Sequence, residues 1–226
     1  MTQGFNRVAL VALLAGAGAA GMASAQTAGS LLYRVGATQI TPDVTSGNLT
    51  APSFAGTTAD IKSNTQLTGG ITYMLTDSIS LDLPLAAGFK HDIVGDGAIA
   101  GVGKIGEVKA LPVTLLAQYR LFGPKDALRP YLGVGVTYAK FYKARSTAAL
   151  TALTGGTPSN PTSIEVQSKF AGTVQAGVSY QVMPGWAIDA TVLKTFLKTR
   201  TTLSTGQTLD ATLDPLSVCI GVVFKF

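Results

Sequence analysis

Residues 79–90 read Ile-Ser-Leu-Asp-Leu-Pro-Leu-Ala-Ala-Gly-Phe-Lys, and an apolar side chain occupies every second position. Successive side chains of a β-strand point to opposite faces, so this stretch predicts a strand with one apolar face and one mainly polar face. The apolar face consists of Ile79, Leu81, Leu83, Leu85, Ala87 and Phe89. Such a strand suits a position between lipid on one side and water on the other.

The same period of two recurs along the rest of the chain. It is strong in 111–121 and 216–226, and weaker in 31–41, 67–75, 129–143, 170–182 and 186–196. Eight strands are the smallest even number typical of bacterial outer-membrane barrels. The predicted fold class is therefore all-β, an eight-stranded antiparallel transmembrane β-barrel. The alternative is a periplasmic β-sandwich, whose strands average about 5 or 6 residues, whereas a tilted membrane-spanning strand needs about 9 to 11.

The 226-residue chain is poor in charge and apolar on average. Charged residues make up 13% of it, whereas soluble proteins contain about 25%, and its mean hydropathy is +0.34. The length fits one domain. This composition argues against a charge-coated soluble enzyme, and it excludes a disordered chain.

Cys219 is the only cysteine and His91 the only histidine, which excludes a disulfide framework and a multi-thiolate or histidine metal cluster. The 17 basic residues are scattered along the chain, so nucleic acid is not an expected partner. His91 next to Asp92 is the only pair that resembles acid–base chemistry, and its place at a strand end is typical of a solvated loop residue. We expect no enzymatic activity and no cofactor.

The first 25 residues have the layout of a secretory signal peptide. A short segment with one positive charge precedes the apolar run 8–20, and Ala23-Ser24-Ala25 supplies the small residues of a cleavage site. The alternative, a membrane anchor, needs about 20 apolar residues. We therefore expect cleavage after Ala25, a barrel formed by 26–226, and export to the outer membrane of a Gram-negative bacterium.

The predicted connections alternate in length. Short turns are expected at 76–78, 123–128 and 183–185, and long ones at 42–65, 91–108, 144–167 and 200–212. Short periplasmic turns and long extracellular loops are typical of outer-membrane barrels. A short helix at 146–153 is a possible element of the third long connection, before the breakers Gly155 and Gly156.

Several segments together resemble the OmpW family of outer-membrane proteins. The strongest are Leu111-Pro112-Val113-Thr114-Leu115-Leu116-Ala117-Gln118-Tyr119 and Arg129-Pro130-Tyr131-Leu132-Gly133-Val134-Gly135-Val136-Thr137-Tyr138. Segments 64–67, 73–77, 89–91, 213–215 and 224–226 are similar to the family in order and spacing, and the terminal Phe226 resembles the assembly signal of such barrels.

This resemblance implies an eight-stranded barrel with a narrow, rather hydrophobic lumen through which small apolar molecules enter. The alkane-uptake barrels named AlkL are related to the family. An interior aromatic residue of the family corresponds to Phe170, which would then be a constriction. Strict alternation places Phe170 on the lipid face instead, so a bulge would be needed to turn it inward.

Alternation also predicts which polar residues face the lumen. Four charged residues lie on inward positions near the periplasmic strand ends: Arg34, Asp82, Arg120 and Asp189. Two cations and two anions in a narrow barrel are expected to pair, which predicts a salt-bridged floor below a more apolar upper lumen. The lumen above them is expected to be lined by Gln118, Tyr131, Thr137 and Gln175.

Two further surfaces follow from residue types. Glycine and proline weaken a strand ladder, so a solute could leave sideways into the bilayer near Pro84, Gly88, Pro112, Gly133 and Gly135. Basic residues gather at the outer strand ends, where lipopolysaccharide phosphates are the expected partner and a solvated basic edge is the alternative. They are Lys140, Lys143, Arg145, Lys169, Lys194, Lys198 and Arg200.

The sequence therefore predicts a passive outer-membrane channel for small hydrophobic solutes, surrounded by outer-membrane lipid and lipopolysaccharide. The alternative is a non-conducting barrel that serves adhesion or membrane integrity, because eight strands enclose little space beyond their own side chains. The sequence does not define an oligomeric state.

Overall fold

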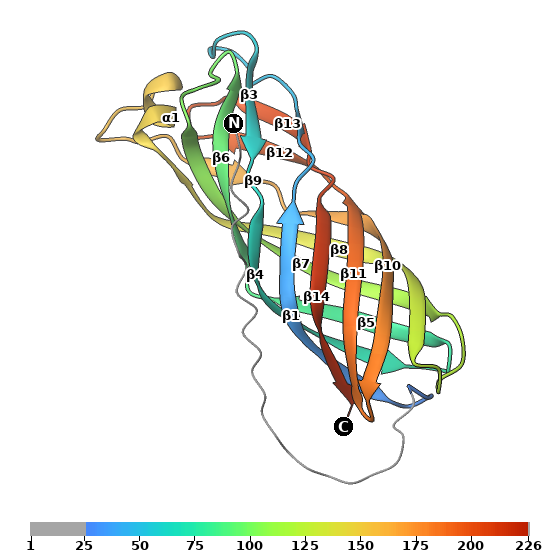
Figure 1. Ribbon diagram of the computed structural model, residues 1–226. Coiled ribbons are helices and arrows are strands. Elements are labelled where there is room, and N and C mark those ends of the chain that lie inside the picture. The colour runs from blue at the N-terminus through green and yellow to red at the C-terminus, as the bar shows by residue number, and fades with distance from the viewer. Residues whose placement is uncertain (1–25, 226) are drawn as a thin grey trace, which may run out of the picture.

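The structure is a computed structural model that describes residues 26–225, so the predicted signal peptide and Phe226 lie outside the described residues. Eight strands form a closed antiparallel barrel (Figure 1), in which β7 pairs with β8 and β1 pairs with β14. The barrel strands are β1 (Leu31–Thr41), β4 (Asn64–Met74), β5 (Ile79–Ala86), β7 (Lys104–Arg120), β8 (Leu128–Ser146), β10 (Lys169–Met183), β11 (Trp186–Phe196) and β14 (Leu216–Lys225). The predicted fold class is confirmed.

The two ends of the barrel differ, as the sequence predicted. Short turns join the strands at one end, and β14 also finishes there (Figure 1). The opposite end continues into an extracellular extension, which contains the upper parts of β7 and β8 together with β2 (Thr45–Ser46), β3 (Thr57–Ile61), β6 (Phe89–Gly97), α1 (Ala148–Leu153), β9 (Ile164–Val166), β12 (Lys198–Leu203) and β13 (Thr208–Thr212). Within residues 26–225, no helix is both long and apolar enough to cross a membrane.

Two of the predicted long loops are strand hairpins. β6 pairs with the start of β7 over 91–94 and 104–108, and β12 pairs with β13 through most of 200–212. β3 adds to the edge of β6, while β2, β13, β12 and β9 form a separate four-stranded sheet. The sheets of the extension pack around buried aliphatic residues, namely Ile99, Ile105, Leu150, Ile164 and Leu203.

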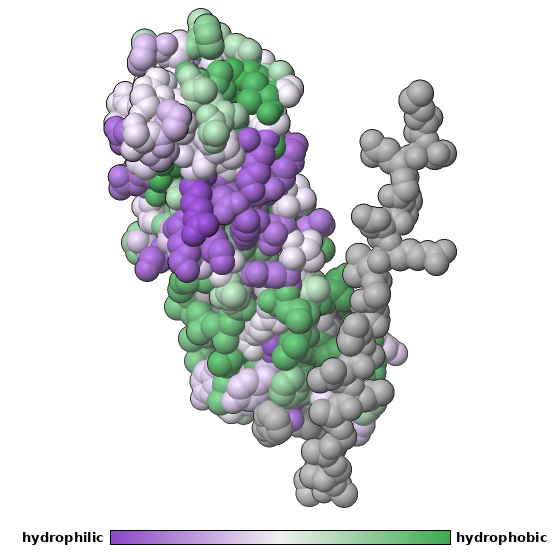
Figure 2. Space-filling view, turned by 90° about the vertical axis from the view of Figure 1, so that its left-hand side faces the viewer, coloured by the Kyte–Doolittle hydropathy of each residue, from purple (hydrophilic) through white to green (hydrophobic). Residues whose placement is uncertain are grey.

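The outer face of the barrel is apolar and exposed. Val35, Leu132 and Ile220 are 56%, 60% and 58% exposed, whereas inward neighbours such as Arg34 and Tyr131 are buried. Figure 2 shows this apolar surface below a hydrophilic band that separates it from the extension. Since a large exposed apolar surface is unfavourable in water, the apolar belt is the part of the barrel that faces hydrocarbon.

The alternation of 79–90 changes phase near its end. β5 ends at Ala86 and β6 begins at Phe89, so Ala87 and Gly88 belong to neither strand. The predicted outward position of Phe89 is therefore wrong, because these two irregular residues reverse which face the following side chains occupy. Phe89 is 1% exposed, and Lys90, predicted inward, is exposed.

Candidate functional site

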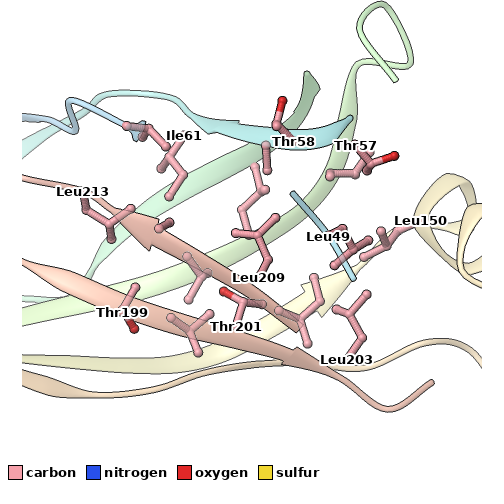
Figure 3. A pocket seen from close by; sticks show the side chains of 18 of the residues that line it. Leu49, Thr57, Thr58, Ile61, Leu150, Thr199, Thr201, Leu203, Leu209 and Leu213 are labelled. Carbon is pink, nitrogen blue, oxygen red and sulfur yellow. The ribbon is translucent and has the colours of Figure 1, made fainter. Parts of the chain in front are cut away.

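An apolar cavity of about 80 Å³ lies inside the extracellular extension (Figure 3). Aliphatic side chains from strands, from α1 and from connecting segments point into it, among them Leu49, Ile61, Leu150, Leu203, Leu209 and Leu213. Among the described residues that line it, only Thr57, Thr58, Thr199 and Thr201 are polar, and none is charged. Such a cavity suits an apolar molecule, which gains stability when its surface leaves water.

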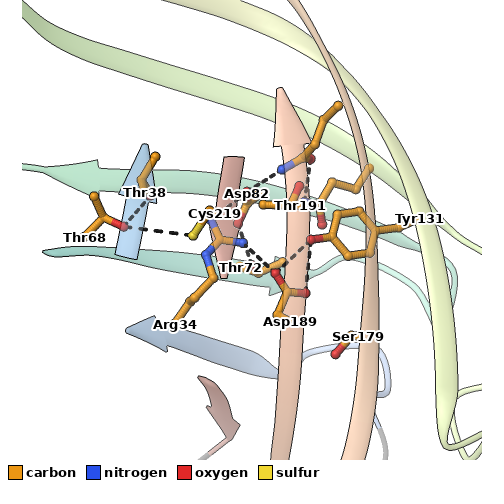
Figure 4. A network of polar contacts seen from close by, with 12 residues as sticks. Arg34, Thr38, Thr68, Thr72, Asp82, Tyr131, Ser179, Asp189, Thr191 and Cys219 are labelled. Atoms are coloured by element: carbon orange, nitrogen blue, oxygen red, sulfur yellow. Dashed lines mark hydrogen bonds and ion pairs between the residues drawn. The ribbon is translucent and has the colours of Figure 1, made fainter. Parts of the chain in front are cut away.

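Below the cavity, charged side chains fill the lumen near the short-turn end (Figure 4). The Arg34 guanidinium lies between two carboxylates, 3.4 Å from an oxygen of Asp82 and 3.5 Å from one of Asp189. Thr72 donates a 2.6 Å hydrogen bond to Asp82, and the Tyr131 hydroxyl donates to Asp189 at 3.0 Å. Because these groups are almost completely buried, each charge depends on its partners rather than on water.

Arg120 belongs to the same lumen, but the prediction that it pairs with an aspartate is wrong. Within residues 26–225 it forms no ion pair. Its guanidinium donates instead to Gln118 at 2.9 Å and to Ser80 at 3.3 Å, and it lies over the Tyr131 ring at 4.6 Å. Neutral acceptors and the ring replace a carboxylate here, because Arg34 already occupies the space between the two aspartates.

A third arginine, Arg129, also lies in the lumen, where it was not predicted, and is 1% exposed. It donates to the main-chain oxygens of Gln26 (3.0 Å) and Asp77 (2.6 Å), and so connects the start of the described chain to a periplasmic turn. The signal was available, since Arg129 and Tyr131 share one face of the same strand. Three arginines and two aspartates therefore occupy this end of the lumen.

The four predicted lining residues are all buried inside the barrel. Gln118 accepts a hydrogen bond from Ser80 at 2.9 Å and donates one to Gln175 at 2.8 Å. Thr137 belongs to a row of hydroxyls that crosses four adjacent strands at 2.6–3.0 Å, formed by Thr114, Thr137, Thr173 and Thr195. The inward side chains of β7 become more polar toward the short-turn end. Val108 lines the cavity, Thr114 and Gln118 follow, and Arg120 comes last.

The barrel wall has a break between β5 and β7. The β5–β7 pairing ends at Asp82–Leu116, and the β6–β7 pairing begins at Phe89–Ala110. Residues 83–88 therefore make no registered pair with β7.

Two of the proposed opening residues, Pro84 and Pro112, account for this break. The β4–β5 ladder runs through Pro84 and the β7–β8 ladder through Pro112 without a register shift at either residue. A proline has no backbone N–H, and here each missing donor lies on the side of the break. Pro84 on β5 lacks the donor toward β7, and Pro112 on β7 lacks the donor toward β5. Gly88 lies at the upper end of the break, where a Cβ would overlap the Tyr142 hydroxyl.

The other two opening candidates lie in intact wall, so that part of the prediction is wrong. Gly133 and Gly135 pair with both β7 and β10. A Cβ at Gly135 would overlap the Leu115 carbonyl oxygen, and one at Gly133 would come within 2.7 Å of Gln175 Oε1. These glycines allow the strands and lumen side chains to approach closely.

Phe170 does not constrict the lumen. Its side chain is 74% exposed and packs against Tyr138 on the outer face, with ring centroids 4.7 Å apart. The β8–β10 ladder runs past it without a bulge, so nothing turns it inward.

His91 is not a solvated loop residue, contrary to the prediction. It lies in β6, is 4% exposed, and its Nδ1 donates to the Lys62 carbonyl oxygen at 2.8 Å. A buried imidazole with a fixed partner was not evident in the sequence because Lys62, which directly follows β3, is brought to β6 by the pairing of β3 with β6 across a long irregular segment.

The predicted basic rim divides into two parts. On the β10–β12 side, Lys194 approaches Asp43 at 3.5 Å, and Arg200 forms a bidentate pair with Asp210 at 2.7 Å. The Arg200 hydrogen bonds lower the pKa of the Asp210 carboxyl. Lys169 and Lys198 are exposed on this side. On the β8 side, Lys140, Lys143 and Arg145 are exposed and form no ion pair within the described chain.

Comparisons with known proteins agree with this architecture. Outer membrane protein W of Salmonella typhi is 31% identical over 222 residues, which cover 97% of this chain and 96% of that protein. Dibenzothiophene metabolism operon protein PahQ of Pseudomonas aeruginosa is 26% identical and covers 86% of this chain and 87% of its own length. The crystal structure of OprG from Pseudomonas aeruginosa superposes with a TM-score of 0.79 at 27% identity, over 89% of this chain and 98% of OprG. The OmpW family model matches residues 27–226, and the chain therefore belongs to the OmpW family of outer-membrane proteins.

Proposed function

We propose that the protein admits small hydrophobic molecules through its apolar cavity and releases them sideways into the outer membrane through the break between β5 and β7. The cavity carries the proposal: its lining is apolar apart from four threonines, so it favours solutes without charge. One relative is named for a dibenzothiophene metabolism operon, and dibenzothiophene is such a compound.

The filled lower lumen supports a sideways route. An apolar solute that continued toward the periplasm would displace hydrogen bonds and ion pairs around Arg34, Asp82 and Asp189. Leaving those buried groups unpartnered costs several kcal/mol, on the order of 3–5 for a buried ion pair. The break flanked by Pro84 and Pro112 borders hydrocarbon instead, where an apolar solute is stable.

The test fills the cavity. Ala59→Trp places a large ring in the cavity lining, and Ala176→Trp adds the same ring on the exposed outer face as a matched control. Cavity occupation is measured with an apolar phenyl-diazirine photoprobe, by mass spectrometry of labelled peptides from 198–213, a segment of the extension above the membrane. Uptake is measured from the fluorescence of N-phenyl-1-naphthylamine in cells that carry each variant.

We expect wild type and Ala176→Trp to be labelled in 198–213 and to take up the dye. Ala59→Trp should lose both the labelling and the uptake above that of cells without the protein. If wild type is neither labelled nor faster than cells without the protein, the channel is refuted and the non-conducting barrel is favoured.

A second proposal concerns lipopolysaccharide at the basic rim. Lys140, Lys143 and Arg145 are exposed on β8, and none of them forms an ion pair with an acidic side chain of the described residues, although Glu107 lies opposite Arg145 on β7. Unpaired cations above an apolar belt suit lipid phosphates, which form charge-assisted contacts. The rim cations of β10–β12 suit them less, because Lys194 and Arg200 already have acidic partners.

This difference defines a matched pair of variants. Replacing Lys140, Lys143 and Arg145 with Gln should reduce the lipopolysaccharide that co-purifies with the folded barrel. Replacing Lys194, Lys198 and Arg200 with Gln removes the same formal charge and should leave the amount nearly unchanged. Equal retention by both triple variants would favour a merely solvated basic edge.

A further inference from the structure

Two aromatic side chains stand between the apolar cavity and the wall break. On the inner face of β6, positions 89, 91 and 93 follow one another away from the periplasm. Ile93 lines the cavity, while Phe89 comes directly after the break residues 87 and 88. Phe89 and His91 are both buried. A solute that moves along β6 from the cavity to the break therefore meets the His91 ring and then the Phe89 ring.

His91 is held in place by the end of the β3–β6 ladder. The last backbone bond of this ladder runs from the Lys62 amide to the Asp92 carbonyl oxygen at 2.9 Å. The Lys62 carbonyl then accepts from His91 Nδ1 at 2.8 Å, so a side chain takes the place of the next backbone donor. Since Ile61, the residue directly before Lys62, lines the cavity, this hydrogen bond fixes the imidazole at the cavity's lower edge.

Phe89 differs from His91 because it has no polar group to anchor its ring. It stacks on His91 with ring centroids 6.4 Å apart and an interplanar angle of 24°. Gly88 precedes it, and residues 83–88 make no registered pair with β7. A change of χ1 at Phe89 would open the space next to His91 without breaking a hydrogen bond.

We propose that Phe89 is a gate that controls the passage of small apolar solutes from the cavity to the wall break, with His91 as its fixed support. This inference rests on the proposed function, because it concerns the route by which a solute leaves the cavity. It assigns the narrow point of the route to the start of β6, whereas the aromatic residue expected there from the sequence, Phe170, faces lipid.

The experiment separates binding from release. Phe89→Ala removes the gate, Phe89→Trp enlarges it, and Phe170→Ala makes the matched change on the outer face. All three are expressed as the full chain, and folding is checked by heat-modifiable migration on gels. Cavity occupation is read from photoprobe labelling of 198–213, and release from the uptake rate of N-phenyl-1-naphthylamine.

We expect equal labelling in all folded variants. Uptake should rise about tenfold in Phe89→Ala, which corresponds to ~1.4 kcal/mol in the barrier, fall below wild type in Phe89→Trp, and stay unchanged in Phe170→Ala. Unchanged uptake in folded Phe89→Ala would overturn the gate while leaving the cavity as a binding site. If Phe89→Ala does not fold, uptake by Phe89→Trp at or above the wild-type rate overturns it. Absence of labelling in wild type would refute the proposed function itself.

Discussion

At the scale of single residues, burial determines how much stability is lost when one partner of an ion pair is removed. Arg34 is 6% exposed and is the ion-pair partner of both Asp82 and Asp189, which are 0% and 1% exposed. Arg200 and Asp210 form a shorter bidentate pair, yet both are exposed. Water solvates the exposed carboxylate when its partner is removed, whereas the buried carboxylates have no such substitute.

Arg34→Met should therefore destabilise the barrel by about 3–5 kcal/mol at neutral pH, because it leaves two buried carboxylates without a cation. Arg200→Gln should change the unfolding free energy little, although it removes the better hydrogen-bond geometry. Both values come from urea unfolding of the protein in lipid vesicles. A similar loss in the two variants would mean that geometry rather than burial determines the contribution of these pairs.

The alternation of side chains places many individual residues correctly but depends on an unbroken strand. It predicts that Arg34, Asp82, Arg120 and Asp189 share the inner face, and they are all buried. It fails at Phe89, because the two irregular residues before it reverse the phase. The hydrogen-bond partner of Arg120 was also beyond a sequence argument, since the choice between Asp189 and Gln118 depends on sub-ångström positions inside the closed barrel.

At the scale of elements, the wall break is a consequence of two prolines on facing strands. Pro84 and Pro112 each leave one missing N–H on the side of the other strand, while the outer ladders with β4 and β8 stay intact. The break is thus local, because the strands on both sides of it remain paired with their outer neighbours.

Replacing both prolines with Val should restore two backbone donors to this part of the wall. We expect new protection of amides in 83–88 and 111–115 against hydrogen exchange, together with slower uptake of an apolar dye. Pro130→Val is the control, since Pro130 pairs with Val178 in a complete part of the wall. If protection increases and uptake does not change, the solute leaves by another path.

The sequence predicts the strands inside the membrane better than those outside it. Inside, lipid on one face imposes a strict apolar period, so eight strands and the short turns are evident. In the extension, β6 and β12 are surrounded by water and other strands, and segments such as 91–97 and 198–203 carry no such period. The sequence therefore predicts loops at 91–108 and 200–212, although backbone pairing extends into both.

At the scale of the whole molecule, polarity is sorted along the barrel axis. The extension encloses an apolar cavity, a row of threonine hydroxyls follows, and three arginines and two aspartates close the periplasmic end. A barrel that conducted apolar solutes straight through would need an apolar lining along the whole lumen. The sorting here instead offers an apolar entrance, a polar floor and a break in the wall at an intermediate height.

Replacing Arg34 and Arg120 together with Ala tests whether that floor and the solute route are separate. The double variant removes the side chain between Asp82 and Asp189 and the one that lies over Tyr131, so water and ions gain a passage. Single-channel conductance in planar bilayers should rise. Uptake of an apolar dye should stay near the wild-type rate, because a hydrated pore lined by two carboxylates is still unfavourable for an apolar solute and the β5–β7 break is untouched. If uptake increases in proportion to conductance, solutes pass straight through the barrel and the sideways route is wrong.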